Sequence, residues 1–98
     1  MDSATKDTYQ QLKKIVYSHV PDATYKAFVF GSRARGQNRP FSDLDVGILG
    51  PEPLPSQTYI ELVDALENSD IPYRVDLVDF ASAADTFKQK AIVRAIGL

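Results

Sequence analysis

The stretch FGSRARGQNRPFSDLDVGI, from Phe30 to Ile48, joins a glycine-serine turn, three arginines and two aspartates that stand two residues apart. At its C-terminal end, residues Leu44–Leu49 alternate in polarity, which is typical of a β-strand. The short aromatic and β-branched run Tyr25–Phe30 predicts another strand, which ends at Gly31. The stretch therefore predicts two strands of one sheet, connected by a polar loop that opens at a glycine.

Outside this stretch, apolar residues at helical spacing predict three helices, and a second alternating run predicts a third strand. The segments are, in chain order, a helix over about Thr5–His19, a helix over Tyr59–Leu66, a strand over Tyr73–Phe80 and a helix over Phe87–Ala95. Ser82, with Asp85 three residues later, resembles a capping box that would open the last helix. A short helix is also expected to begin near Gly31. This order of elements predicts one domain over residues 1–98, in which a small sheet is covered by helices.

Composition excludes several kinds of site. The 98 residues contain no cysteine and a single histidine, His19, so disulfides, thiolate zinc sites and most histidine-ligated metal sites are excluded. A bound metal would need oxygen ligands, which favours Mg²⁺, Mn²⁺ or Ca²⁺. The formal net charge of -2 argues against a protein that binds duplex nucleic acid through a broad basic face. No apolar run approaches the length of a membrane span and the N-terminus lacks a signal-peptide core, so we expect a cytoplasmic protein.

Two carboxylates stand at the start of the strand Leu44–Leu49. Asp43 and Asp45 would project from one face, roughly 6–7 Å apart along the backbone, because side chains on a strand alternate. If the third strand lies beside this one, Asp76 can complete a cluster of three acidic ligands. Asp79 has the opposite parity and lies at the strand end, which makes Asp76 the better candidate. Three carboxylates on neighbouring strands suit two hard cations, an arrangement used for in-line displacement at phosphorus. An isolated Asp-x-Asp is common on solvated strands, so this prediction depends on a phosphate site nearby.

Gly31 and Ser32 follow directly on a strand and could supply that phosphate site. A glycine lets the backbone approach a ligand closely or adopt dihedral angles that a side chain forbids. Ser32 could cap a short helix, whose free N–H groups favour an anion. Arg33, Arg35 and Arg39 add guanidinium donors suited to phosphate oxygens. Taken alone, these residues fit a tight turn with a capping serine and exposed arginines better than a phosphate site. Their position beside the acidic pair favours a site for a metal-bound nucleoside triphosphate.

The order of Gly31 and Ser32, ten further residues and then Asp43–Asp45 resembles the signature of the DNA polymerase beta-like nucleotidyltransferase superfamily. The fuller stretch looks like its minimal nucleotidyltransferase branch, whose members are small proteins, many of them antitoxins paired with HEPN-domain toxins. The run VDLVD at Val75–Asp79 supports the resemblance. The resemblance implies the polymerase beta-like fold, which is an α/β (α+β) fold with a small mixed β-sheet of about three to four strands flanked by helices.

The resemblance also implies roles for individual residues. The metal-binding and catalytic carboxylates of the family match Asp43, Asp45 and Asp76. The turn that holds the nucleotide phosphates, with its frequently basic neighbours, matches Gly31, Ser32, Arg33 and Arg35. The third carboxylate, Asp76, can also accept the proton of the attacking hydroxyl. The implied cofactors are two Mg²⁺ ions, with Mn²⁺ as the other choice.

The implied reaction is attack of a hydroxyl on the α-phosphate of a nucleoside triphosphate, with AMP expected to come from ATP and pyrophosphate leaving. We expect no acceptor domain within the chain, so the implied acceptor is a partner protein from an adjacent gene, namely a tyrosine of a HEPN toxin. A homo-oligomer or hetero-oligomer remains open. The alternative is a non-catalytic antitoxin or regulatory subunit that acts by occlusion with a vestigial nucleotide site. Vestigial sites usually lose a carboxylate, whereas all three are present here. An α/β domain with an accidental motif is the third possibility.

Overall fold

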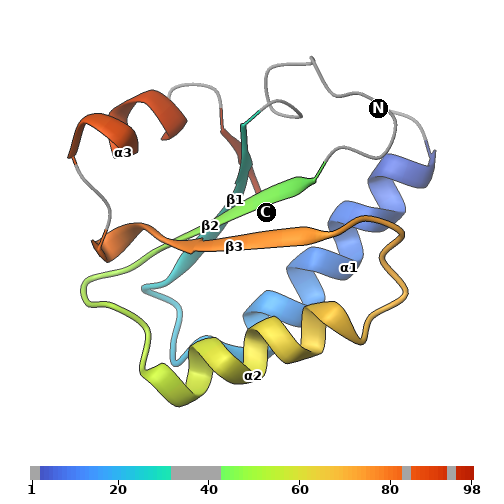
Figure 1. Ribbon diagram of the computed structural model, residues 1–98, viewed down its shortest axis with the longest axis horizontal. Coiled ribbons are helices and arrows are strands. Elements are labelled where there is room, and N and C mark those ends of the chain that lie inside the picture. The colour runs from blue at the N-terminus through green and yellow to red at the C-terminus, as the bar shows by residue number, and fades with distance from the viewer. Residues whose placement is uncertain (1–2, 32–42, 83–84, 93–94) are drawn as a thin grey trace.

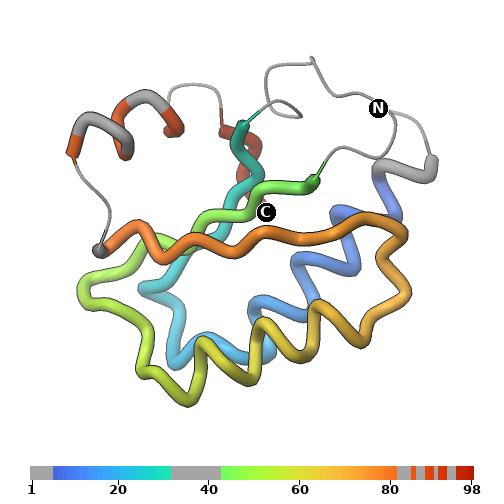
Figure 2. Tube along the Cα trace, in the orientation of Figure 1, coloured from blue at the N-terminus to red at the C-terminus, as the bar shows by residue number. Residues whose placement is uncertain are grey.

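The computed structural model describes residues 3–31, 43–82, 85–92 and 95–98 of the chain (Figures 1 and 2). The elements in these ranges are α1 (Ser3–His19), β1 (Lys26–Phe30), β2 (Leu44–Leu49), α2 (Ser56–Glu67), β3 (Val75–Asp79), the 3-10 helix η1 (Phe80–Ser82), α3 (Asp85–Ile92) and β4 (Ile96–Gly97). Figure 1 shows α1 and α2 together on one side of the sheet, with α3 on the other side. None of the helices in these ranges has the length and apolar character that a membrane span requires.

The strands in the described ranges form one mixed sheet with the order β3-β2-β1-β4. β1 pairs in antiparallel fashion with β2 and with β4, whereas β2 and β3 are parallel. A parallel pair needs a crossover connection, and α2 supplies it. β3 and β4 are therefore the edges of the sheet. The predicted small mixed sheet of three to four strands, flanked by helices, is confirmed.

The face of the sheet toward α1 and α2 carries the main hydrophobic core. Leu44, Val46 and Ile48 alternate along β2 and have no exposed surface, as their spacing predicts. They belong to one cluster with buried side chains of both helices, namely Leu12 and Val16 of α1 and Leu62 and Leu66 of α2. The two long helices are thus held to the sheet by apolar packing, which is the dominant favourable contribution to folding.

The opposite face of the sheet carries a separate aromatic cluster. The rings of Phe28 and Phe30 both pack edge-to-face against Phe80, with centroid distances of 4.9 Å and 5.1 Å. Ala91 of α3 packs against the same cluster. Gly47 of β2 makes room for the rings, because an added Cβ would lie 2.5 Å from a carbon of Phe28 and 2.7 Å from one of Phe80. Apolar packing of Ala91 on these rings therefore connects α3 to this face of the sheet.

Most predicted elements are confirmed, and the differences lie at the ends of elements. β2 has the predicted bounds, whereas β3 is shorter than the predicted strand because Phe80 begins η1. The prediction that the last helix continues to Ala95 was wrong, since α3 ends at Ile92 and Ala95 leads into β4. No local pattern in the sequence predicted β4. This strand has two residues and exists through its pairing with β1, a contact between distant parts of the chain.

Two local predictions fall on segments outside the described residues. The short helix expected near Gly31 would occupy residues in the range 32–42. The capping box of Ser82 and Asp85 spans residues 83–84. Both stay predictions.

Candidate active site

The register of the sheet brings two of the predicted carboxylates together. Asp45 of β2 and Asp76 of β3 are partners in the parallel pair. Their Cα atoms are therefore separated by about one strand spacing, 4.8 Å, and their side chains share one face of the sheet. Asp45 is half-buried and Asp76 is exposed. Two like charges at this spacing repel each other, so the pair favours a cation shared between them.

Asp43 is exposed and lies directly before β2. The parallel ladder begins with the pair of Leu44 and Val75, so Asp43 lies outside it. The pairing of the strands therefore does not fix the orientation of Asp43. In the described part of the chain, no group of three or more His, Cys, Asp or Glu side chains is gathered closely enough to hold a metal ion. The structure thus places Asp45 beside Asp76 but does not gather Asp43 with them into a three-ligand cluster.

Gly31 connects the end of β1 to this pair of carboxylates. Its φ of 78° lies in the left-handed region, which a residue with a side chain adopts only with strain. Phe30, the preceding residue, is the register partner of Asp45, so the chain leaves β1 beside that carboxylate. A Cβ added at Gly31 would overlap Asp45 Oδ2. Two features therefore require glycine at position 31, as predicted: the left-handed backbone conformation and the close approach to Asp45.

The rest of the predicted phosphate-binding turn lies outside the described residues. This applies to Ser32, Arg33, Arg35 and Arg39. Their roles stay predictions, and Gly31 is the part of the turn that the structure places beside Asp45.

The second carboxylate of β3, Asp79, accepts hydrogen bonds from two backbone N–H groups. Its Oδ2 accepts a hydrogen bond from the Leu54 N–H at 2.7 Å, and its Oδ1 accepts one from the Ala81 N–H at 3.0 Å. These bonds fasten the proline-rich connection between β2 and α2 to the end of β3. The Asp76 side chain, in contrast, makes no hydrogen bond or ion pair within the described residues. These contacts give Asp79 a structural role that Asp76 does not share within the described residues.

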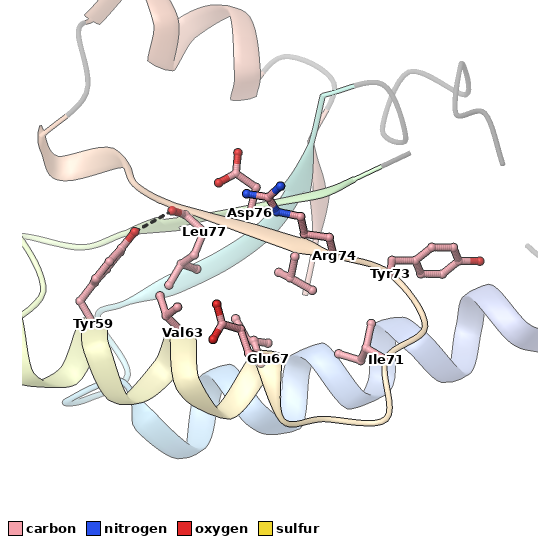
Figure 3. A pocket seen from close by; sticks show the side chains of 10 residues that line it. Tyr59, Val63, Glu67, Ile71, Tyr73, Arg74, Asp76 and Leu77 are labelled. Carbon is pink, nitrogen blue, oxygen red and sulfur yellow. Dashed lines mark hydrogen bonds between the residues drawn. The ribbon is translucent and has the colours of Figure 1, made fainter. Parts of the chain in front are cut away.

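A cavity of about 330 Å³ opens beside Asp76, between α2 and the edge strand β3 (Figure 3). Arg74 and Asp76 extend on the side of β3 away from α2, whereas Glu67 points from α2 toward the strand. The sequence patterns did not predict this cavity. Its walls come from two elements whose packing no local pattern reports.

The donor atoms of the site suit a hard divalent cation. Asp45 and Asp76 offer carboxylate oxygens, which are the ligands that Mg²⁺ and Mn²⁺ prefer. The chain has no cysteine, so it offers no thiolate ligand for softer metals such as zinc. The carboxylate oxygens of these residues therefore suit a site for Mg²⁺ or a similar ion.

Comparisons with known sequences agree with this geometry. The family described as polymerase beta, nucleotidyltransferase, matches residues 10–97. A Haemophilus influenzae protein named "Probable protein adenylyltransferase MntA" is 39% identical over 85 residues, which cover 87% of this chain and 71% of that protein. The matched region includes both strands that carry the paired carboxylates.

Solved structures share the fold. A protein assigned as a minimal nucleotidyltransferase is similar with a TM-score of 0.77 and 28% identity, over 100% of this chain and 97% of that one. A toxin–antitoxin structure with AMP-PNP is similar with a TM-score of 0.74 and 26% identity, over 90% of this chain and 69% of that one. The chain belongs to the polymerase beta nucleotidyltransferase family.

Proposed function

We propose that this protein is a metal-dependent nucleotidyltransferase that transfers AMP from ATP to a hydroxyl of a partner protein. The observation that carries the proposal is the register of Asp45 with Asp76, next to the left-handed turn at Gly31. The similar Haemophilus protein is named as an adenylyltransferase of proteins. AMP-PNP, present in the similar toxin–antitoxin structure, is an analogue of ATP. Both support adenylyl transfer.

Nucleotidyltransferases of this family use divalent metals. For this chain we propose two ions, Mg²⁺ or Mn²⁺, held by Asp43, Asp45 and Asp76. Bound cations would lower the pKa of the acceptor hydroxyl and neutralise charge on the departing pyrophosphate. Asp45 is suited to this role because pairing on both sides, with Phe30 and Asp76, fixes its backbone. Asp43 would turn toward the pair from its exposed position before β2.

The protein groups position the nucleotide and handle the proton. The turn at Gly31 and Ser32 would present backbone N–H groups to the phosphates, with Arg33 and Arg35 as guanidinium donors. The acceptor oxygen forms a bond to the α-phosphorus, and the bond from that phosphorus to the bridging oxygen of pyrophosphate breaks. The exposed carboxylate of Asp76 accepts the proton of the acceptor hydroxyl.

The proposed acceptor is a tyrosine of a HEPN toxin encoded by the adjacent gene. The resemblance to minimal nucleotidyltransferases motivates this choice, and the similarity to a toxin–antitoxin structure supports it. Asp76 lies on an edge strand with its side chain exposed, so a protein can approach it from solvent.

The test combines the purified protein with Mg²⁺, α-labelled ATP and the purified toxin. We expect label on the toxin, and we expect the double substitution Asp43→Ala with Asp45→Ala to abolish it. Asp70→Ala, at an exposed position before β3, serves as the control and should transfer label like the wild type.

Absence of label transfer by the wild-type protein would contradict the proposal, as would transfer that the double substitution leaves unchanged. Full neutralisation of the toxin in cells by the double variant would favour the alternative, a non-catalytic antitoxin that acts by occlusion.

A further inference from the structure

A groove runs from Asp76 along the free edge of β3 and across the outer face of α2. Its deeper part is the cavity of about 330 Å³ between the two elements, and a shallower hollow of about 260 Å³ lies on α2. The two parts share Tyr59, Val63 and Glu67. We call them together the α2–β3 groove, and Figure 3 shows its deeper part.

The α2–β3 groove has an apolar floor and an acidic rim. Val63, Val75 and Leu77 contribute apolar surface to the floor. Four ionisable residues line the groove, namely Asp64, Glu67, Asp76 and Arg74. Figure 3 shows the Asp76 and Arg74 side chains on the side of β3 away from α2, so the carboxylates of Asp64 and Glu67 supply the charge of the rim. Figure 3 shows the Glu67 carboxylate directed from α2 toward β3. The groove therefore combines apolar contact surface with a negative charge.

The shallower part of the groove includes an unusually exposed apolar side chain. Ile60 of α2 is 60% exposed, and the other exposed large apolar side chain of the described residues is Ile92 of α3, at 44%. Ile60 lies beside Val63 in the lining. An isolated exposed apolar residue is ordinary, but Ile60 adjoins Val63 in a hollow whose surface is mainly apolar, and contiguous exposed apolar surface is typical of interaction sites.

The edge of β3 is partly closed by Tyr59. Its hydroxyl donates a hydrogen bond to the Leu77 carbonyl at 3.0 Å, on the side of the strand that faces away from β2 (Figure 3). A strand added to this edge would have to displace the tyrosine. The groove therefore suits inserted side chains better than strand addition.

We propose that the α2–β3 groove docks the acceptor protein through an amphipathic segment rich in lysine or arginine. Its apolar side chains would cover Ile60 and Val63, and its basic side chains would lie against Asp64 and Glu67. This rests on the proposed function, because the groove lies along the edge strand β3, which carries the Asp76 carboxylate on its side away from α2. A protein docked at this edge can reach past β3 and bring a hydroxyl of another of its segments to the paired carboxylates.

Charge distinguishes this partner from a second copy of the chain. In a two-fold symmetric dimer the same surface patch meets itself. The carboxylates of Asp64 and Glu67 would then face their own copies and repel them. A basic partner meets the same rim with favourable electrostatics, which raises the rate of association and excludes wrong partners.

The test uses two groove variants, Ile60→Asp and Glu67→Lys, each with a matched control. Ile92→Asp places the same change on α3, and Glu61→Lys reverses a charge on α2 at a residue that does not line the groove. Calorimetry with the purified toxin from the adjacent gene measures affinity. We expect each groove variant to bind the toxin at least about tenfold more weakly, the size of loss seen at interface hot spots. The controls should bind like the wild type, and all four variants should bind AMP-PNP with Mg²⁺ unchanged.

Groove variants that bind the toxin like the wild type would overturn the docking proposal, as would control variants that lose affinity equally. Sedimentation of the chain alone adds a further outcome: a wild-type dimer that Ile60→Asp dissociates would assign the groove to a second copy and overturn the proposal. Wild-type protein that binds the toxin through the groove but transfers no label would contradict the proposed function alone. Label transfer with unaffected groove variants would contradict the docking proposal alone.

Discussion

The two faces of the sheet use the same strands for different purposes. On the face toward α1 and α2, the alternate residues of β2 are apolar and have no exposed surface. On the other face, the alternate residues of β2 are Asp45, Gly47 and Leu49. Asp45 is charged, Gly47 has no side chain, and Leu49 is only half-buried. α3 and the aromatic cluster pack on this second face, which also carries Asp45 and Asp76. We propose that alternation along β2 separates stability from chemistry. Substitutions on the first face should change the free energy of unfolding, and carboxylate substitutions on the second should change activity.

The largest effect is expected from Asp45→Asn. This change keeps the size of the side chain but removes its charge, which we assign to metal binding. Transfer of label from ATP should fall about a thousandfold, equivalent to roughly 4 kcal/mol of transition-state stabilisation. Initial rates with the toxin as acceptor measure this loss, and circular dichroism checks that the variant is folded. A rate within about tenfold of wild type would remove Asp45 from the mechanism.

A core substitution on the face toward α1 and α2 should lower stability and leave the transfer activity unchanged. Leu62 of α2 has no exposed surface and packs in the main core. Leu62→Ala should lower the free energy of unfolding by about 3 kcal/mol, since it removes buried apolar surface and leaves a cavity. Urea denaturation measures this change. The transfer rate per folded molecule should stay at the wild-type value, and a rate that fell with stability intact would show that the two faces are not separate.

A smaller loss of stability is expected from Gly47→Ala. The added methyl group would press against the rings of Phe28 and Phe80, and overpacking of this kind costs about 2 kcal/mol. Thermal or urea denaturation tests the prediction. Combining Gly47→Ala with Phe28→Leu should recover part of the loss, because the smaller side chain vacates the space. No effect from the single substitution would show that the aromatic cluster is not closely packed around Gly47.

The smallest change in stability is expected from a substitution at Asp22, in the turn before β1. The Thr24 hydroxyl and the Thr24 N–H, the latter at 2.8 Å, donate hydrogen bonds to the Asp22 carboxylate and lower its pKa below the ordinary value of 3.8. A carboxyl with a lowered pKa in the folded state contributes stability above its unfolded pKa and loses it as the pH falls through the folded value. Asp22→Ala should therefore be slightly less stable than wild type at pH 7, and the difference should shrink below pH 3.8. A difference that does not change with pH would contradict this account.

Much of this arrangement follows from local sequence patterns, and the rest depends on contacts between distant segments. The period of two in Leu44–Leu49 predicted which residues are buried, and the same parity argument placed Asp76 on the face of Asp45. Sequence alone did not establish that β2 and β3 are neighbours, because that pairing depends on the crossover through α2. β4 was missed because two residues carry no detectable period.

At the candidate site, the need for a glycine at position 31 was predictable from its place after a strand, but its contact with Asp45 was not. That contact arises from the antiparallel register in which Phe30 pairs with Asp45. The α2–β3 groove was missed for the same kind of reason, since α2 and β3 form it together only when they pack.

The separation of chemistry from stability is tested most directly by comparing Asp76→Ala with Asp79→Ala. The two residues lie on the same strand, and Asp79 accepts two backbone hydrogen bonds whereas the Asp76 side chain accepts none from the described residues. Asp79→Ala should lower the free energy of unfolding by about 1–3 kcal/mol, because it leaves two backbone donors without partners, and should keep the transfer rate per folded molecule. Asp76→Ala should lower the transfer rate at least about a hundredfold and change the free energy of unfolding by less than about 0.5 kcal/mol. The reverse result, with activity lost through Asp79 and retained without Asp76, would contradict the assignment of the active site.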